Sequence, residues 1–426
     1  MKKPGFDTLM IHAGQTPDTD TLSRGLPIYQ TTAYVFKNVK HARDLFALKE
    51  EGNIYTRLQN PTNDVLEKRI AALDGGIGGL AASSGHAAMF MTFANLCSQG
   101  DEIVSSICIY GGAINMMGVS LKKLGIKVNF VDPDDFDAWE AAVTDRTKAF
   151  FVEAVGNPNA NVADIERIAK IAHSHGIPLI VDSTFTTPYL LRPIEWGADI
   201  VIHSATKFLG GHGSSMEGIV VDSGRFEWLG NPRFPDFNNP DESYHGIVYA
   251  KDCGNAAFIN KLRANVMRDY GAVASPFNSY LILQGVETLS LRMQRHSENA
   301  QRIAEYLSES PYVKFVNYPG LKSSKYYELA QKYLPRGCGG VFTFGLNGDR
   351  KTCERFIESL QIFSHVANVG DVRSLVIHPA STTHSQLSDE QLAAAGITPT
   401  TIRLSIGLED VNDLIDDLEN AMKAAQ

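Results

Sequence analysis

The 426-residue sequence has few cysteines and no long apolar run. Its five cysteines are odd in number, scattered and without a Cys-x-x-Cys pair, which favours a reducing compartment over a disulfide framework. No stretch approaches the length of a transmembrane helix, and no apolar segment follows the lysines near the N-terminus to make a signal peptide. We therefore expect a cytoplasmic protein that has no membrane partner.

Positive charge is also scarce. The net charge is −9, and no run of Lys and Arg occurs, whereas phosphate backbones are bound by clustered cations. A nucleic-acid partner is therefore not expected. With 44% hydrophobic and 20% charged residues, the composition is that of an ordinary globular protein, and the length suits two or three domains.

The pattern along the chain changes near residue 63. The first 60 or so residues are rich in turn formers and have few periodic apolar positions, so they cannot build a core and are expected to lie across another surface. Strands and helices then alternate up to about residue 221, with nearly continuous apolar strands, which indicates a mainly parallel sheet covered on both faces. The expected strands are Ile103–Cys108, Val128–Val131, Ala149–Glu153, Leu179–Asp182, Ile200–His203 and Gly218–Val221.

A helix between two of these strands has recognisable ends. Asn161 is the expected N-cap, Ile165 and Ile168 begin its apolar face, and Gly176 with Pro178 ends it.

The last part of the chain has a different pattern. Residues 222–260 are rich in Pro, Asn, Gly and aromatics and are interpreted as a long insertion. Helices around Pro276–Leu283 and His296–Leu307, strands at Val313–Asn317 and Val341–Leu346, and a closing helix from Val411 follow. These elements predict a smaller α+β domain.

The segment Val201–Gly213 is the most informative in the sequence. An apolar strand leads into Ser204, Thr206 and Lys207 and then into a glycine-rich turn. Hydroxyl groups beside a lysine suit an amine held next to a phosphate, where the hydroxyls bond phosphate oxygens and the amine reaches a carbonyl carbon. Taken alone, this pattern is more often a surface lysine after a strand.

Asp182 changes that balance. It stands at the carboxyl end of an expected parallel strand, where ligands of such sheets bind. Pyridoxal chemistry needs an anion beside the pyridine nitrogen, so that the ring stays protonated and accepts electrons. Without Lys207, a turn or helix-capping aspartate would be an equally good interpretation.

Together with three further segments, these residues resemble the cystathionine synthase/lyase family of pyridoxal phosphate (PLP) enzymes of Cys/Met metabolism. Asn53–Thr62 resembles the family's Y-x-R-x-x-N-P-T segment, Ala82–Ala87 its phosphate turn, and Ile109–Gly112 its ring-stacking tyrosine. The resemblance covers essentially the whole chain. It implies an α/β fold of PLP fold-type I, with a mainly parallel seven-stranded sheet flanked by helices and a smaller α+β C-terminal domain.

The resemblance also implies a domain arrangement. Residues 1–62 would be an extended arm on a neighbouring subunit, 63–265 the PLP-binding domain and 266–426 the C-terminal domain. A homotetramer built from site-sharing dimers is the family's habit.

The same resemblance assigns roles at the cofactor. Lys207 would carry PLP as a Schiff base, with Ser204 and Thr206 beside its phosphate. The backbone N–H groups of Gly85 and His86 would bind that phosphate, as helix N-termini do.

Three further side chains complete the expected cofactor site. Arg57 would supply a charge-assisted fork to the phosphate. Tyr55 and Arg57 would come from the neighbouring subunit. Tyr110 would stack on the ring and take part in proton transfer, unless it is simply a core aromatic at a strand end.

The C-terminal segments Arg373–His384 and Ile402–Gly407 point to substrate binding. In the family, the arginine that corresponds to Arg403 holds the substrate carboxylate, with Ser374 near it and Asn157 as a further candidate. An arginine between apolar neighbours is an odd place for a solvated charge, so a bidentate carboxylate partner is reasonable. An internal salt bridge is the alternative.

Two details favour one branch of the family. The insertion around Phe234–Tyr249, with Ser275–Asn278 and Leu283–Glu287, looks like the O-acetylhomoserine sulfhydrylase branch, and Gly112 stands where methionine γ-lyases typically carry cysteine. The expected reaction is a PLP-dependent γ-replacement, in which O-acetyl-L-homoserine and sulfide (or methanethiol) give L-homocysteine (or L-methionine) and acetate.

Alternatives within the family are a methionine or homocysteine γ-lyase, an O-succinylhomoserine-using sulfhydrylase and a cystathionine γ-synthase. A catalytically silent homologue is an alternative from another class, against which the intact set of site residues argues.

Two other patterns are set aside. Gly76–Ala81 fits a dinucleotide-binding pattern on paper, but an expected helix precedes it where that motif needs a strand. The twelve histidines show no spacing suited to a closed metal site, so no metal is expected. His378 and His384 are expected to fix the substrate loop.

Overall fold

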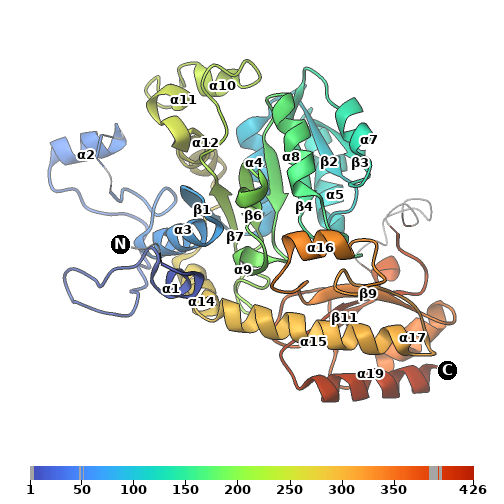
Figure 1. The fold of residues 1–426 in the computed structure, drawn as a ribbon. Coiled ribbons are helices and arrows are strands. Elements are labelled where there is room, and N and C mark those ends of the chain that lie inside the picture. Colours follow the sequence, from blue (N-terminus) through green and yellow to red (C-terminus); the bar gives the residue numbers. More distant parts are fainter. Residues whose placement is uncertain (1–3, 48, 51, 383–391, 393–395) are drawn as a thin grey trace.

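The computed structural model describes residues 4–47, 49–50, 52–382, 392 and 396–426 (Figure 1). Within these residues the strands form a seven-stranded sheet in the order β1-β7-β6-β5-β4-β2-β3 and a five-stranded sheet in the order β10-β11-β12-β9-β8. The first sheet comprises β1 Gly78–Ala82, β2 Glu102–Ser106, β3 Lys127–Val131, β4 Thr147–Glu153, β5 Leu179–Asp182, β6 Ile200–His203 and β7 Gly218–Asp222. The second comprises β8 Val313–Asn317, β9 Val341–Leu346, β10 Ser364–His365, β11 Leu375–Ile377 and β12 Thr401–Ser405.

The seven-stranded sheet is parallel except for β7, which pairs antiparallel with both β1 and β6. Its central strands β5 and β6 are apolar up to their last residue, as is typical of strands that are covered on both faces. Ile180 and Ile202 pack into one core cluster, whereas their chain neighbours Val181 and Val201 pack into the other. The sequence-based prediction of a covered, mainly parallel sheet is confirmed.

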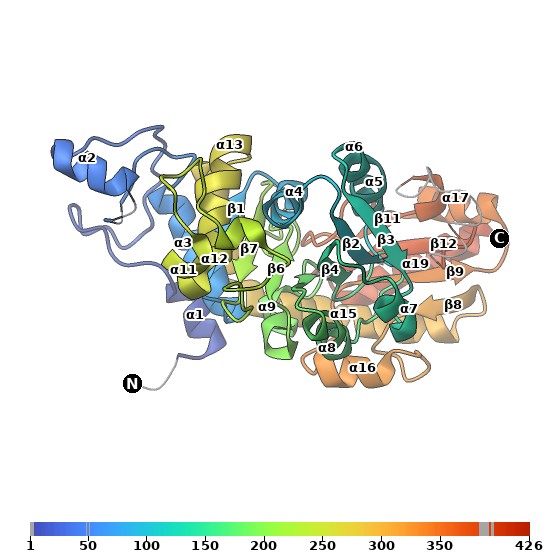
Figure 2. The ribbon, with the colours of Figure 1, turned by 90° about the horizontal axis from the view of Figure 1, so that it is seen from above.

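Helices lie on both faces of this sheet (Figures 1 and 2). They are α3 Pro61–Asp74, α4 Gly85–Leu96, α5 Gly111–Asn115, α6 Leu121–Lys123, α7 Phe136–Ala141, α8 Ile165–Ser174 and α9 Thr187–Leu190, with a π-helical turn η1 Met116–Ser120 and a 3₁₀ turn η2 Pro193–Trp196.

One cap prediction is wrong. The side chain that caps α8 is Asp164, which accepts from the Arg167 N–H, and not Asn161. Asn161 lies one loop earlier, where its carbonyl accepts from the Gly156 N–H and a bridge joins Val155 to Val162. That loop, which the sequence pattern did not reveal, delays the helix.

The expected insertion folds into short helices against one face of the sheet. They are α10 Pro235–Asn238, α11 Tyr249–Asp252, η3 Gly254–Ala256, α12 Ala257–Lys261, the π-helical η4 Leu262–Met267 and α13 Arg268–Tyr270. Trp228 stacks on Phe237, with ring centroids 4.4 Å apart, and is buried with Phe234 and Phe258. The aromatic content of this segment therefore builds core.

The C-terminal helices follow the insertion. These are α14 Pro276–Val286, which packs on α3, then α15 Leu289–Glu309, α16 Tyr327–Tyr333, α17 Arg350–Ser359 and α19 Val411–Ala425, with the turn η5 Pro379–Ser381. α15 packs against α9 and also against β8, β9 and α19, so it connects the two sheets.

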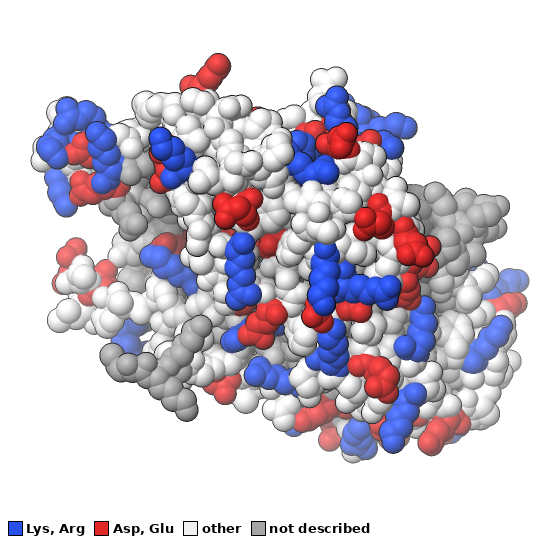
Figure 3. All heavy atoms as spheres, turned by 45° about the horizontal axis from the view of Figure 1, so that its top comes forward, with Lys and Arg blue, Asp and Glu red and all other residues white. Residues whose placement is uncertain are grey.

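The N-terminal segment stands apart from both sheets. α1 Phe6–His12 packs on α3, but α2 Val39–Phe46 projects away in both views (Figures 1 and 2). Val35 and Val39 are 95% and 87% exposed. Such exposed apolar side chains are expected of an arm that packs on another subunit and not on its own chain. In the space-filling view, Lys and Arg are interspersed with Asp and Glu (Figure 3). Within the described residues, none of the helices has the length and apolarity needed to cross a membrane.

Candidate active site

Lys207 lies in the tight turn that follows β6. Its Nζ donates to Oδ1 of Asn368 at 2.5 Å, and no carboxylate of the described residues pairs with it. Burial and the nearby Arg403 guanidinium lower the pKa of the Lys207 amine to about 8. A lysine that loses its proton this readily can act as a nucleophile and as a base near neutral pH.

Asp182 ends the neighbouring strand β5. Its Oδ1 accepts from the Thr184 N–H at 2.9 Å, and Ile202 of β6 is its register partner, so Asp182 and the Lys207 turn leave the same edge of the sheet. Burial raises the pKa of the Asp182 carboxyl, while hydrogen bonds from Thr184 and the nearby His203 act against that rise.

The N-terminus of α4 meets the Lys207 turn. A side chain at Gly85 would bring a Cβ within 2.7 Å of the Ser204 Cβ, so only glycine allows this contact. Ser84 caps the helix by accepting from the Ala87 N–H, and the N–H groups of Gly85 and His86 lie in the first turn, which has no intrahelical partners. This end of α4 can therefore bind an anion.

The two hydroxyl residues of the turn have different surroundings. The Ser204 N–H donates to Oγ1 of Thr184, and the Ser204 hydroxyl has no partner among the described residues. The Thr206 hydroxyl donates to the Glu217 carbonyl and accepts from the Glu217 N–H, both at 3.1 Å. Thr206 is thus tied to the start of β7, whereas Ser204 is free for a ligand.

Tyr110 stands at the start of α5, beside α4. Its ring meets the His86 ring edge to face, with centroids 5.7 Å apart, and is 40% exposed. A Cβ at Gly112 would lie 2.5 Å from the Tyr110 ring, so glycine there keeps the ring against His86. The interpretation of Tyr110 as a core aromatic does not fit this exposure.

Arg403 of β12 is buried, and no carboxylate of the described residues pairs with it. Its Nη1 donates to Oδ1 of Asn157 at 3.0 Å and its Nη2 to the Asn368 carbonyl at 3.3 Å. Among the described residues no carboxylate lies within ion-pair distance, which contradicts the internal salt bridge considered above. Burial lowers the pKa of Arg403 to about 10. A buried cation that meets only neutral acceptors is a site for an anionic ligand.

Ser374 makes its hydrogen bonds to the turn that follows β12. Its hydroxyl donates to Glu409 at 2.9 Å and accepts from the Gly407 N–H at 2.9 Å, which fixes the turn after β12. Asn368 contacts both Lys207 and Arg403, and the substrate-binding role of Ser374 stays a prediction.

The histidine expected to hold the substrate loop does make loop contacts. His378 bonds Ser381 at 2.8 Å and the Pro399 carbonyl at 2.9 Å, one through each ring nitrogen. His384 lies outside the described residues.

Tyr55 and Arg57 are not brought to the site by their own chain. The Arg57 guanidinium donates to the Arg268 carbonyl at 2.5 Å and lies over the Tyr55 ring. Tyr55 is 42% exposed. No contact within the described residues joins either side chain to the Lys207 turn, the start of α4 or Tyr110.

The structure adds two residues that the sequence reasoning missed. One is Asn368. The other is Glu153 at the end of β4, whose carboxylate accepts from the N–H groups of Tyr110 at 2.7 Å and Asn157 at 3.1 Å. A signal existed for Glu153, because it ends an expected strand just as Asp182 does. Asn368 had no comparable signal, since its loop lacks any periodic pattern.

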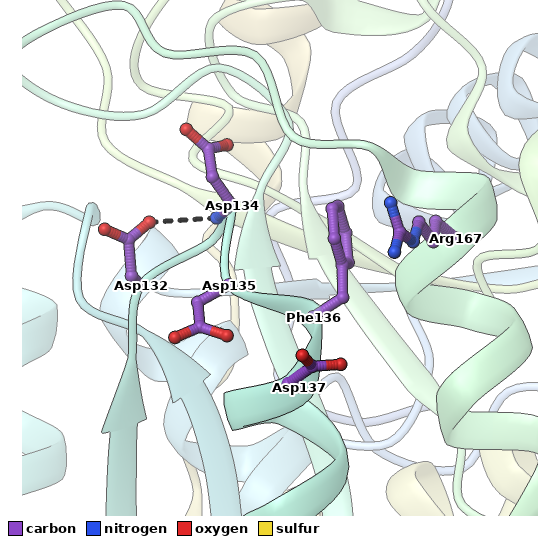
Figure 4. Close-up of a pocket in the computed structure, with 6 residues that line it drawn as sticks. All are labelled: Asp132, Asp134, Asp135, Phe136, Asp137 and Arg167. Carbon is purple, nitrogen blue, oxygen red and sulfur yellow. Dashed lines mark hydrogen bonds between the residues drawn. The ribbon is translucent and has the colours of Figure 1, made fainter.

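A hollow of about 540 Å³ lies elsewhere, at the end of β3 (Figure 4). It is lined by Asp132, Asp134, Asp135, Phe136, Asp137 and Arg167. It lacks a lysine like Lys207, and within the described residues no group of three or more His, Cys, Asp or Glu side chains could hold a metal ion, here or elsewhere.

The site residues fit PLP. The α4 N-terminus and the free Ser204 hydroxyl suit its phosphate, Asp182 suits the pyridine nitrogen, and Lys207 offers an amine of lowered pKa for its carbonyl carbon. Tyr110 is partly exposed and lies against His86, at the same end of α4.

Comparison with known proteins gives the same result. Residues 7–423 match the family described as Cys/Met metabolism PLP-dependent enzyme. The chain is 50% identical to the O-acetyl-L-homoserine sulfhydrylase of Leptospira meyeri, over 98% of this chain and 96% of that one. It is 49% identical to the homocysteine synthase of Schizosaccharomyces pombe, over 99% and 98%.

A solved structure from Campylobacter jejuni that carries a pyridoxyl-lysine phosphate superposes with a TM-score of 0.95. It is 42% identical to this chain and covers 99% of it and 100% of its own chain. The chain therefore belongs to the Cys/Met metabolism family of PLP-dependent enzymes.

Proposed function

We propose that the protein is an O-acetyl-L-homoserine sulfhydrylase, which replaces the acetyl ester at Cγ with sulfide, or with a small thiol such as methanethiol. The products are L-homocysteine, or L-methionine, and acetate. Relatives named O-acetyl-L-homoserine sulfhydrylase at 50% identity over nearly the full chain support this activity. A role in methionine and homocysteine biosynthesis follows.

One structural observation carries the proposal. Arg403 and the amine of Lys207 both contact Asn368. A ligand carboxylate bound to Arg403 would therefore be separated from the amine by about the width of one side chain. This is the arrangement that an α-amino acid requires, because its carboxylate and its reacting Cα are adjacent atoms. Asn157 completes the carboxylate site by orienting Nη1 of Arg403.

When bound, PLP acts as an electron sink that makes the substrate protons at Cα and Cβ acidic. Lys207 accepts the Cα proton at Nζ and returns it at the end, and its lowered pKa suits both steps near neutral pH. Asp182 would keep the pyridine nitrogen of the bound cofactor protonated, and Tyr110 would stack on its ring. Arg403 keeps the amino acid oriented while acetate leaves and the sulfur nucleophile adds at Cγ.

We infer that the active unit is a dimer with shared sites, assembled into a homotetramer. The support is that Tyr55 and Arg57 belong to a projecting arm and reach no residue of their own chain's site within the described residues. In a dimer, each arm would supply both side chains to the partner's phosphate and ring. We also place the protein in the cytoplasm, for which the free state of all five cysteines is the support.

The proposal is tested with purified PLP-loaded protein and O-acetylhomoserine, with and without sulfide, by following homocysteine and 2-oxobutanoate together. Homocysteine that appears only with sulfide, accompanied by little ketoacid, is expected. Abundant ketoacid regardless of sulfide would identify a γ-lyase and overturn the proposal. O-succinylhomoserine in parallel assigns the acyl group, and Lys207→Ala is the inactive control.

A further inference from the structure

Asn368 occupies the junction between the two functional cations. It lies in the loop between β10 and β11, where its side-chain Oδ1 accepts from Nζ of Lys207 at 2.5 Å. Its main-chain carbonyl accepts from Nη2 of Arg403 at 3.3 Å. One residue therefore touches the amine that is expected to move protons and the guanidinium that is expected to bind the substrate.

The loop that carries Asn368 is clamped on both sides. Gly370 has a φ of +75°, and a Cβ there would lie 2.7 Å from the Phe208 N atom, so only glycine lets the loop pack this closely on the Lys207 turn. The Gly370 N–H donates to Oγ of Ser405, and the Val372 N–H donates to the Gly211 carbonyl. The position of Asn368 is thus set by contacts with β12 and with the Lys207 turn.

We propose that Asn368 is a positioning residue that holds the ε-amine of Lys207 next to the substrate carboxylate site whenever that amine is not bonded to the cofactor. This inference rests on the proposed function only in naming the carboxylate as that of the substrate. The hydrogen bond itself belongs to the chain without any ligand.

The amide oxygen has a distinct effect on the amine. Lys207 has a flexible four-carbon side chain, and one strong acceptor limits the conformations that this chain samples. The oxygen can only accept, so it favours the protonated amine, whereas burial and the Arg403 charge favour the neutral amine. No carboxylate of the described residues faces Nζ, so Asn368 is the group that opposes Arg403.

The test measures the proton affinity of Lys207 in the full-length protein after PLP has been removed. Competitive acetylation over a range of pH, read by mass spectrometry of the peptide that contains Lys207, gives its pKa and its reactivity. The variants are Asn368→Leu, which keeps the branching of the side chain without an acceptor, and Asn368→Asp, which places a charge there. Asn347→Leu, on the exposed turn after β9, is the matched control.

We expect Asn368→Leu to lower the pKa of Lys207 by about one unit. At a given pH, the ratio of neutral to protonated amine then rises about tenfold. Asn368→Asp should raise the pKa by a similar amount, and Asn347→Leu should leave it unchanged. Titration curves for both Asn368 variants that coincide with the control would overturn the proposal.

Two controls keep the test decisive. Circular dichroism checks that each variant is folded, and if Asn368→Leu does not fold, the nearly isosteric Asn368→Asp decides alone. Because the labelling uses no substrate, a failed sulfhydrylase assay would refute the proposed function and leave this result intact.

Discussion

Glu153 and Asp182 are register partners at the ends of β4 and β5, so two carboxyl side chains stand side by side at the buried edge of the sheet. Burial and the Asp182 charge raise the pKa of Glu153 well above its ordinary value, while two backbone N–H groups that donate to it act in the opposite direction. Through those N–H groups, Glu153 fixes both Tyr110, which is proposed to stack on the cofactor, and Asn157, which contacts Arg403.

Glu153→Gln should therefore disturb both halves of the site. The amide offers one acceptor oxygen where the carboxylate offered two, so one buried N–H loses its partner at a cost of ~1–3 kcal/mol. We expect the free energy of unfolding, measured with urea, to fall by that amount. The KM for O-acetylhomoserine should rise. Glu140→Gln on the exposed side of α7 is the control, and equal KM values for the two variants would contradict this role.

Arg403→Met should separate stability from function. Removing a buried, unpaired charge should raise the melting temperature of the substrate-free protein, because the desolvation of the guanidinium is no longer required. The same change should lower kcat/KM for O-acetylhomoserine by a factor that corresponds to ~2–5 kcal/mol. Thermal unfolding and steady-state kinetics check the two effects. A kcat/KM within a few-fold of the wild-type value would mean that the carboxylate binds elsewhere.

Glu217 should make stability fall as the pH rises. Burial raises the pKa of its carboxyl from 4.5 to about 8, so the folded protein holds a proton that the unfolded chain releases. The resulting stability is fully present below pH 4.5 and is lost as the pH rises through 8. The neutral Glu217→Gln should match wild type at pH 4.5 and exceed it by roughly 2–5 kcal/mol at pH 9 in urea unfolding. Parallel pH profiles for the two proteins would contradict the assignment.

Shared sites predict complementation between inactive variants. Arg57→Ala lacks an arm residue and Lys207→Ala lacks the amine, so a mixed dimer would contain one site in which both residues are intact. After the two variants are unfolded and refolded together, activity should recover to about a quarter of the wild-type value, as random pairing in a two-fold dimer requires. Each variant refolded alone is the control. No recovery, with mixed dimers demonstrated by mass, would place Arg57 in its own chain's site.

Much of this protein was determined by local sequence. β5, β6 and β9 have the predicted bounds because nearly continuous apolar runs specify buried strands without reference to distant residues. β8 also has the predicted bounds, although Lys314 interrupts its apolar run. Asp182 and Lys207 were predictable for the same reason, since each stands at or just after the end of such a strand. The domain limits at residues 62 and 265 stay a prediction.

Tertiary structure decided the pairings that make the site specific. Asn368 meets Lys207 across 161 residues, and Asn157 meets Arg403 across 246. Neither distance leaves a periodic signal in the chain, because irregular loops are placed by the surfaces they pack on and not by their own propensities. For that reason Asn368 was not predicted at the site, and Asn161 was expected to cap a helix that Asp164 caps. The sequence by itself determined which chemical groups are present at the edge of the sheet. Only the packing of β12 and of the β10–β11 loop on that edge decided which of them touch.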